Sequence, residues 1–236
     1  KSVDCTVNEA QLGCYIQEIA GLVESPTALL GQIEDRFMKL PPEVLQATIA
    51  THQKYITFQD QSGNLSSYFI VVSNRQSDPT RNQVIMAGNQ RVLRARLADA
   101  EFFWQQDQKV RLESYVAELR AITFYDGLGD LHAKSLRLEK LAKVLAPYIA
   151  GCDAQHAGRA GFLAKADLVT SMVGEFPELQ GIIGGYYARH DGEADSVARA
   201  IATHYRPQGP TDDVPEPPAA KAVALADKID TLVGFF

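Results

Sequence analysis

Several signatures of common protein classes are missing from this sequence of 236 residues. It has no phosphate-binding loop of the GxxxxGK[ST] type and no GxGxxG dinucleotide fingerprint. No apolar run approaches the ~20 residues that a membrane-spanning helix requires. Cysteine is scarce, and Cys5, Cys14 and Cys152 are scattered without zinc-site spacing or an even number for a disulfide framework. We therefore expect a cytoplasmic protein with no membrane segment, no metal site and no nucleotide loop of its own.

The overall charge narrows the possible partners. A formal net charge of -6 argues against a general nucleic-acid binder, although a local basic patch on an acidic protein remains open. A hydrophobic content of 46% is enough for a real core, and the length suits one large or two smaller domains.

The two ends suggest a piece of a larger protein. The sequence starts without methionine or a signal peptide, and residues 219–236 (AAKAVALADKIDTLVGFF) place apolar side chains on nearly every side of a helix. Such a helix is expected to be buried, yet it ends on Phe235 and Phe236, whereas natural termini are usually polar. We therefore expect that the protein is truncated at its C-terminus. The alternative is a natural end, because Gly234 is suited to cap a helix.

The first 82 residues mix strand and helix signals. Residues 55–59 and 67–73 are rich in aromatic and β-branched side chains, and the turn cluster 60–64, with Gly63, separates them. This pattern predicts a β-hairpin. The preceding Leu-Pro-Pro-Glu sequence at residues 40–43 predicts the start of a helix that runs to His52 or Gln53.

Beyond residue 82 the pattern predicts helices alone. The expected helices are residues 89–106, 112–121, 130–146, 160–173, 178–188, 195–204 and 219–236, and the proline-rich stretch 206–218 is an exposed loop. The predicted fold class is α+β. A mixed α/β portion with a hairpin spans residues 1–82, a connecting helix spans 83–110, and a helical domain spans 111–236.

One lysine points inward from the helix 130–146. Lys134 lies on the same face as Leu131 and Leu138, and burying an ammonium group requires a counter-charge. Asp167, and Asp227 with Asp230, lie on the apolar faces of two other expected helices. We expect these groups to meet, with the alternative that Lys134 extends along its stem to water.

Residues 134–142 (KSLRLEKLA) are similar in pattern to the first helix of the HD metal-dependent phosphohydrolase superfamily. In that comparison Lys134 and Ala166 stand where the superfamily has histidines, while Asp167 and Asp227 retain the aspartates. Such a site needs imidazole and carboxylate ligands together, so the resemblance implies a degenerate site without metal or catalytic residues. Lys134 would pair with Asp167 and Asp227 in place of the cation. The dipeptide His190-Asp191 is interpreted as an exposed turn at a helix end.

The most specific stretch is residues 88–104 (GNQRVLRARLADAEFFW). Together with blocks at residues 21–26, 40–45, 52–55, 69–74, 166–170, 172–181, 186–193 and 225–236, in this order, it resembles the β subunit of bacterial-type heterotetrameric glycyl-tRNA synthetase. The resemblance extends from about residue 19 to the end. It implies a module like the editing region of the phenylalanyl synthetase β chain, followed by an HD-like domain.

The resemblance also implies a function. The family's α subunit carries the aminoacylation site and uses ATP and Mg with glycine, whereas the β subunit handles tRNA. The chain would therefore be an internal part of an α2β2 glycine–tRNA ligase, with the α subunit and tRNA(Gly) as partners, no cofactor of its own and no activity alone. The alternatives are an HD-type phosphohydrolase and a ligand-free scaffold.

Two groups of basic residues are candidates for RNA contact, because lysine and arginine neutralise phosphates. They are Arg91, Arg94 and Arg96, and Arg137, Lys140 and Lys143. The alternative for both groups is a solvated face with charge pairs along the helix. The glycine-rich residues 181–185 are interpreted as a site of close helix packing rather than a phosphate loop.

Overall fold

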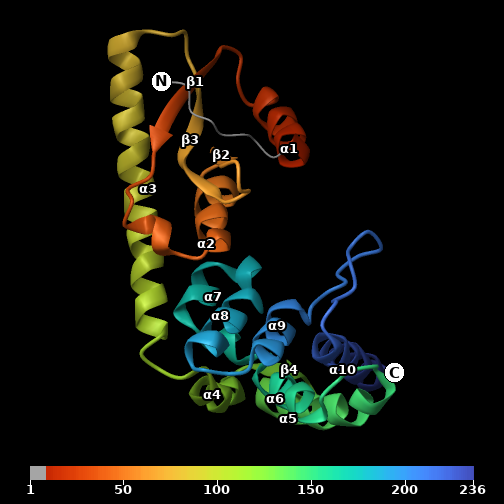
Figure 1. Ribbon diagram of the computed structural model, residues 1–236. Helices are drawn as coiled ribbons and strands as arrows, with labels where there is room; N and C mark the ends of the chain where they lie inside the picture. The colour runs from red at the N-terminus through yellow and green to blue at the C-terminus, as the bar shows by residue number, and fades with distance from the viewer. Residues whose placement is uncertain (1–8) are drawn as a thin grey trace. The chain divides into compact units, whose positions relative to one another are not determined.

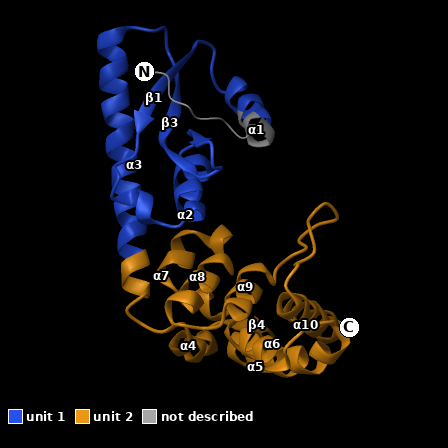
Figure 2. Cartoon of the chain, viewed as in Figure 1, with its two compact units in different colours: residues 1–103 blue, residues 104–236 orange. Residues whose placement is uncertain are grey.

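The computed structural model describes residues 9–236, without the side chains of residues 9–12, 14 and 15. The chain divides into two compact units, Lys1–Phe103 and Trp104–Phe236 (Figure 2). Cys5 and the side chain of Cys14 lie outside the described part, and Cys152 is a free thiol. The α+β class is confirmed, since a small antiparallel sheet lies in the first unit and helices dominate the second (Figure 1).

The first unit is built around a three-stranded antiparallel sheet of order β1-β3-β2. Its elements are α1 (Glu9–Ala20), β1 (Pro26–Gln32), η1 (Phe37–Lys39), α2 (Pro42–Gln46), η2 (Ala47–His52), β2 (Ile56–Gln59), β3 (Leu65–Asn74) and α3 (Pro79–Asp107), whose last residues belong to the second unit. The predicted hairpin is confirmed as β2 and β3, paired from Ile56↔Ile70. The helix expected to reach His52 or Gln53 is also confirmed, as α2 continued by the π-helical η2.

Strand β1 was not predicted from the sequence. It pairs with β3 over its whole length, from Pro26↔Asn74 to Gln32↔Tyr68. Proline and glycine lower the strand propensity of this segment. A close contact explains why glycine occupies position 31. A Cβ at Gly31 would lie 2.7 Å from Cε2 of the buried Phe69, so the ring of Phe69 occupies the space of a side chain there.

The second unit consists mainly of short helices around the longer α5 and α10. Its elements are α4 (Leu112–Tyr115), η3 (Val116–Ala121), β4 (Thr123–Tyr125), β5 (Gly129–Asp130), α5 (Leu131–Leu145), η4 (Ala146–Tyr148), α6 (Ala154–Leu163), η5 (Ala166–Val169), α7 (Ser171–Glu175), η6 (Pro177–Leu179), α8 (Ile182–His190), α9 (Asp195–Thr203) and α10 (Pro218–Phe235). Helix α5 packs on α6 and α10, and α8 packs on α9. Among residues 9–236, no helix combines the length and apolar character needed to cross a bilayer.

Three expectations for this unit are wrong. The region after residue 82 is not purely helical, because β4 and β5 form a small hairpin in which Gly127 and Gly129 have φ of +85° and +84°. The helix expected over residues 160–173 is three segments, because α6 ends at Leu163 and the Thr170 side chain caps the new helix α7. Similarly, Gly181 at φ +81° separates η6 from α8.

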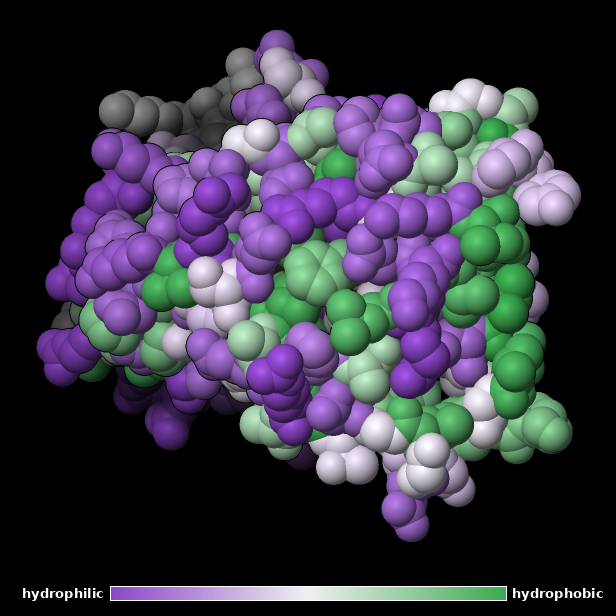
Figure 3. Space-filling model, turned by 90° about the horizontal axis from the view of Figure 1, so that it is seen from below, coloured by the Kyte–Doolittle hydropathy of each residue, from purple (hydrophilic) through white to green (hydrophobic). Residues whose placement is uncertain are grey.

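Helix α10 is buried along only part of its length. Ala219, Val223 and Ala226 are at most 4% exposed, whereas Leu232 is 59% and Val233 74% exposed. The expectation of a fully buried helix is therefore wrong for its last turn. Exposed apolar side chains also occur on α5, where Val144 is 64% exposed, and hydrophobic side chains lie among polar ones on the face seen in Figure 3.

Candidate functional site

Lys134 is buried on α5 and meets two aspartates from α10. Its Nζ atom lies 3.0 Å from Asp227 Oδ1, 3.1 Å from Asp230 Oδ2 and 2.9 Å from Thr231 Oγ1. The predicted pairing of Lys134 with Asp227 is confirmed. The alternative in which the lysine reaches water is wrong, because its side chain is only 3% exposed. Arg137 completes this side by donating from Nε to Asp230 Oδ1 at 2.6 Å.

A second buried lysine, Lys165, holds the other oxygen of the same carboxylate. Its Nζ atom lies 2.8 Å from Asp227 Oδ2 and 2.9 Å from His204 Nε2. No sequence pattern indicated that Lys165 pairs with Asp227. On a continuous helix Lys165 and Asp167 point to opposite sides, and the end of α6 at Leu163 changes the direction of Lys165. We call Lys134, Lys165, His204, Asp227 and Asp230 the ion cluster.

His204 is the neutral member of the ion cluster. Its Nδ1 atom lies 2.7 Å from the carbonyl oxygen of Ile201, so Nδ1 carries the hydrogen and Nε2 accepts from Lys165. Burial, reinforced by the charge of Lys165, lowers the pKa of His204 to about 3. Burial also lowers the pKa of Lys165, an effect that Asp227 opposes. Burial opposes the charge of Asp227, but the ammonium groups of Lys165 and Lys134 hold the pKa of that carboxyl well below its usual range.

Asp167 lies apart from these contacts. Its Oδ2 atom accepts hydrogen bonds from the amides of Gly181 at 2.6 Å and Gly184 at 3.0 Å. The expected ion pair between Asp167 and Lys134 is not among the contacts of the described residues. The Asp167 carboxylate accepts hydrogen bonds from the amides at the start of α8 instead. Burial raises the pKa of Asp167 to about 6, although the two amides oppose this. A Cβ at Gly184 would lie 3.0 Å from Asp167 Oδ2, which agrees with the interpretation of residues 181–185 as a close-packing site.

An open cavity of about 250 Å³ borders the ion cluster. Its charged and polar lining consists of Lys134, Lys165, Asp227 and Thr231, and its apolar lining consists of Phe124, Leu131, Leu168 and Tyr205. The Nζ atom of Lys134 lies 4.1 Å from the ring centroid of Phe124, and that of Lys165 lies 3.8 Å from the ring centroid of Tyr205. Both distances are within the range of cation–π attraction.

Residues 3–236 match the sequence model of a family described as glycyl-tRNA synthetase beta subunit. The chain belongs to this family. It is 48% identical over 227 residues to the glycine–tRNA ligase beta subunit of Phenylobacterium zucineum, covering 94% of this chain and 33% of that protein. It is 49% identical over 222 residues to the corresponding subunit of Neisseria gonorrhoeae, covering 94% of this chain and 32% of that protein. The chain thus spans about a third of the length of these relatives.

The donor set of the ion cluster does not fit a divalent cation in this member of the β-subunit family. Such a cation needs carboxylate oxygens or imidazole nitrogens, yet both oxygens of Asp227 face ammonium groups. Among the described residues, no three His, Cys, Asp or Glu side chains gather as a metal site. The alignment of Lys134, Ala166, Asp167 and Asp227 with the HD superfamily's metal-binding positions stays a prediction.

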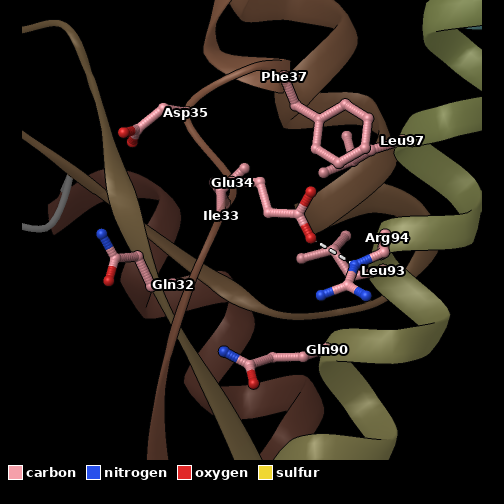
Figure 4. A pocket seen from close by; sticks show the side chains of 9 residues that line it. All are labelled: Gln32, Ile33, Glu34, Asp35, Phe37, Gln90, Leu93, Arg94 and Leu97. Carbon is pink, nitrogen blue, oxygen red and sulfur yellow. Dashed lines mark ion pairs between the residues drawn. The ribbon is translucent and has the colours of Figure 1, made fainter.

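The RNA-contact candidates differ in their surroundings. Arg94 pairs with Glu34 at a cavity of about 380 Å³ in the first unit, where Figure 4 shows the two side chains facing each other. Arg137 pairs with Asp230, and Lys143 Nζ lies 2.7 Å from Glu139. Arg91 and Lys140 are exposed and form no ion pair within the described part of the chain, whereas Arg96 is exposed and has an interaction partner.

His204 and Asp167 are expected to give opposite pH dependences of stability. The pKa of His204 is about 3, below the ordinary 6.5, so the unfolded chain binds the proton first and stability falls between pH 6.5 and 3. The pKa of Asp167 is about 6, above 3.8, so the folded chain binds the proton first and stability rises as the pH falls from 6 to 3.8. Each contribution amounts to about 1.4 kcal/mol per pH unit.

Asp167→Asn is therefore expected to unmask acid sensitivity. In the unchanged chain the two contributions offset each other between pH 6 and 4. In Asp167→Asn the gain in stability from Asp167 is absent, and the loss of stability from the titration of His204 remains. The free energy of unfolding should therefore fall by about 1.4 kcal/mol per pH unit over this interval. Urea unfolding at pH 7, 6, 5 and 4 measures the difference. A flat profile for Asp167→Asn would contradict the neutral state assigned to His204.

Proposed function

We propose that the chain is a tRNA-handling part of the β subunit of an α2β2 glycine–tRNA ligase of the cytoplasm. The observation that carries the proposal is the family match over residues 3–236, with relatives named glycine–tRNA ligase beta subunit. In this proposal the α subunit performs the glycylation of tRNA(Gly) with ATP and Mg, and the chain itself holds no catalytic residue and no cofactor. It contacts the α subunit and tRNA and is inactive alone.

The ion cluster supports a non-catalytic role for the second unit. Lys134 and Lys165 share the two oxygens of Asp227, and His204 is neutral with both ring nitrogens engaged. A general base or nucleophile needs a free lone pair that faces a substrate, and the lone pairs of Asp227 and His204 are directed to the two ammonium groups. The cluster instead links α5 and α10 to the segment between α6 and η5 and to the end of α9.

Lys140 is the sharpest candidate for RNA contact on α5. It is exposed, whereas the neighbouring Arg137 and Lys143 are held by Asp230 and Glu139. Lys140→Glu in the complete α2β2 complex is expected to weaken tRNA(Gly) binding at low salt and to reduce the salt dependence of log K by about one unit of slope. Fluorescence anisotropy at several salt concentrations measures both quantities.

The matched control is Lys109→Glu, which reverses the charge of another exposed lysine. Its tRNA affinity should change less than that of Lys140→Glu. Equal affinities of the Lys140→Glu and unchanged complexes at low salt would remove this face of α5 from the RNA-binding surface.

Two other functions are separated by direct assays. A metal-dependent phosphohydrolase would contain stoichiometric metal and would cleave phosphodiesters, and the donor set of the ion cluster argues against both. A scaffold without a ligand would bind no tRNA. The proposal itself is tested by glycylation with a full-length β subunit that carries or lacks residues 110–236.

A further inference from the structure

The cavity beside the ion cluster has a positive lining. Its charged side chains are two lysines, Lys134 and Lys165, and one aspartate, Asp227. Asp230 is 5% exposed, pairs with both Lys134 and Arg137, and is not among the residues that line the cavity. The buried charges of the ion cluster balance, since Lys134 and Lys165 face Asp227 and Asp230, but an acceptor or an anion that enters the cavity meets two ammonium groups and only one carboxylate.

Lys165 has a donor left for such a group. The ammonium of Lys134 already contacts three oxygens, those of Asp227, Asp230 and Thr231. The ammonium of Lys165 carries three hydrogens as well, but within the described part its oxygen and nitrogen acceptors are two, Asp227 Oδ2 and His204 Nε2. The third N–H of Lys165 has only the ring of Tyr205 beside it, a weak acceptor that an oxygen of a ligand would replace. The pKa of Lys165, lowered by burial, agrees with this incomplete compensation.

The apolar lining supplies two aromatic rings. Phe124 and Tyr205 are both half-buried and both line the cavity. Each ring makes a cation–π contact with a lysine. Lys134 Nζ lies 4.1 Å from the Phe124 centroid, and Lys165 Nζ lies 3.8 Å from the Tyr205 centroid. Proteins that bind single-stranded RNA combine these features, because bases stack on aromatic side chains while cations hold phosphates or base acceptors.

We propose that this cavity receives one unstacked nucleotide of RNA. The base lies against Phe124 and Tyr205, and Lys165 donates to an oxygen of the base or the phosphate. The inference rests on the proposed function, because it takes the RNA to be the tRNA that the β subunit handles. A cavity of about 250 Å³ has room for one nucleobase and not for a duplex.

Phe124→Leu and Tyr205→Leu, made in the full-length β subunit of the α2β2 complex, test the proposal. Both keep an apolar side chain and remove the ring, so each is expected to weaken tRNA(Gly) binding by roughly 5- to 150-fold, the effect of losing a base-stacking aromatic. The matched control is Tyr125→Leu, whose ring is next in sequence and packs on Phe235 outside the cavity. Its affinity should change by less than twofold. Circular dichroism of each variant confirms the fold.

Photocrosslinking provides a readout that does not depend on a variant. Ultraviolet irradiation of the unchanged complex with tRNA(Gly) should leave a nucleotide adduct on a peptide that contains Phe124 or Tyr205. Competition with cytidine monophosphate and with inorganic phosphate then distinguishes the ligand chemistry. Loss of the adduct with the nucleotide but not with phosphate supports the proposal, and equal loss with phosphate shows an anion site without base recognition and overturns it.

The remaining outcomes separate this inference from the proposed function. Unchanged tRNA affinity in both leucine variants, with no adduct at either ring, overturns the nucleotide site even if deletion of residues 110–236 abolishes glycylation. Cytidine monophosphate binding without any effect of the variants on tRNA would assign the cavity to a free nucleotide and would also overturn it. Full glycylation after the deletion overturns the proposed function.

Discussion

Asp227→Asn is expected to destabilise the second unit by about 3–5 kcal/mol, the usual cost of removing one partner from a buried ion pair. The two ammonium groups of Lys134 and Lys165 would face a neutral amide, and their side chains are only 3% and 4% exposed. The free energy of unfolding in urea, followed by the circular dichroism of the helices, measures the loss. The matched control is Asp195→Asn, since Asp195 is 67% exposed and its ion pair with Arg189 is expected to contribute less than about 1 kcal/mol.

A rescue experiment tests the cause of that loss. The triple variant Lys134→Met, Lys165→Met and Asp227→Leu removes all three charges together, so no buried ion is left without a partner. Apolar replacement of a buried ion cluster is often neutral or stabilising, and we expect most of the loss to be recovered. A triple variant as unstable as Asp227→Asn would show that packing, rather than uncompensated charge, explains the effect.

Gly161→Ala is expected to destabilise the contact between α6 and α5 by about 2 kcal/mol. A Cβ at this position would lie 2.8 Å from the carbonyl oxygen of Leu138 and 3.1 Å from the amide nitrogen of Glu139. These are backbone atoms, which cannot turn away, so overpacking should cost about 3 kcal/mol and the helix propensity of alanine should return about 1. Urea unfolding measures the difference.

Gly158→Ala is the matched control on the same helix. The atoms that a Cβ there would meet belong to the side chain of Lys143, which is 39% exposed and can move toward solvent. Its expected effect lies between zero and a gain of about 1 kcal/mol. Equal destabilisation by the two substitutions would contradict the distinction between backbone and side-chain contacts.

Local patterns were enough to predict much of this structure. The hairpin of β2 and β3 follows from alternating side chains around the turn at Gly63, which has φ +81°. The pairing of Lys134 with Asp227 follows from a cation on an apolar helix face, because burial requires a counter-charge. Strand β1 was not predicted, because glycine at position 31 lowers the strand propensity of the segment. In the structure the ring of Phe69 fills the space that a side chain at Gly31 would occupy.

The second half of the ion cluster depended on contacts between distant residues. Lys165 joins Asp227, 62 positions later, and His204, 39 positions later. Helical periodicity cannot show this, because it assumes a helix that continues past Leu163. Because α6 ends early, Asp167 faces the amides of Gly181 and Gly184. The HD-like pattern assigns Asp167 to a metal site and therefore does not predict these hydrogen bonds.

The most direct test of the account is the rate of tRNA(Gly) glycylation by the α subunit with a full-length β subunit that carries residues 110–236 or has a Gly-Ser linker in their place. Gel filtration must show first that both β subunits assemble with the α subunit. If these residues handle tRNA, the deletion should lower kcat/KM for tRNA at least tenfold in an assembled complex. Full glycylation by the assembled deletion complex would contradict the account.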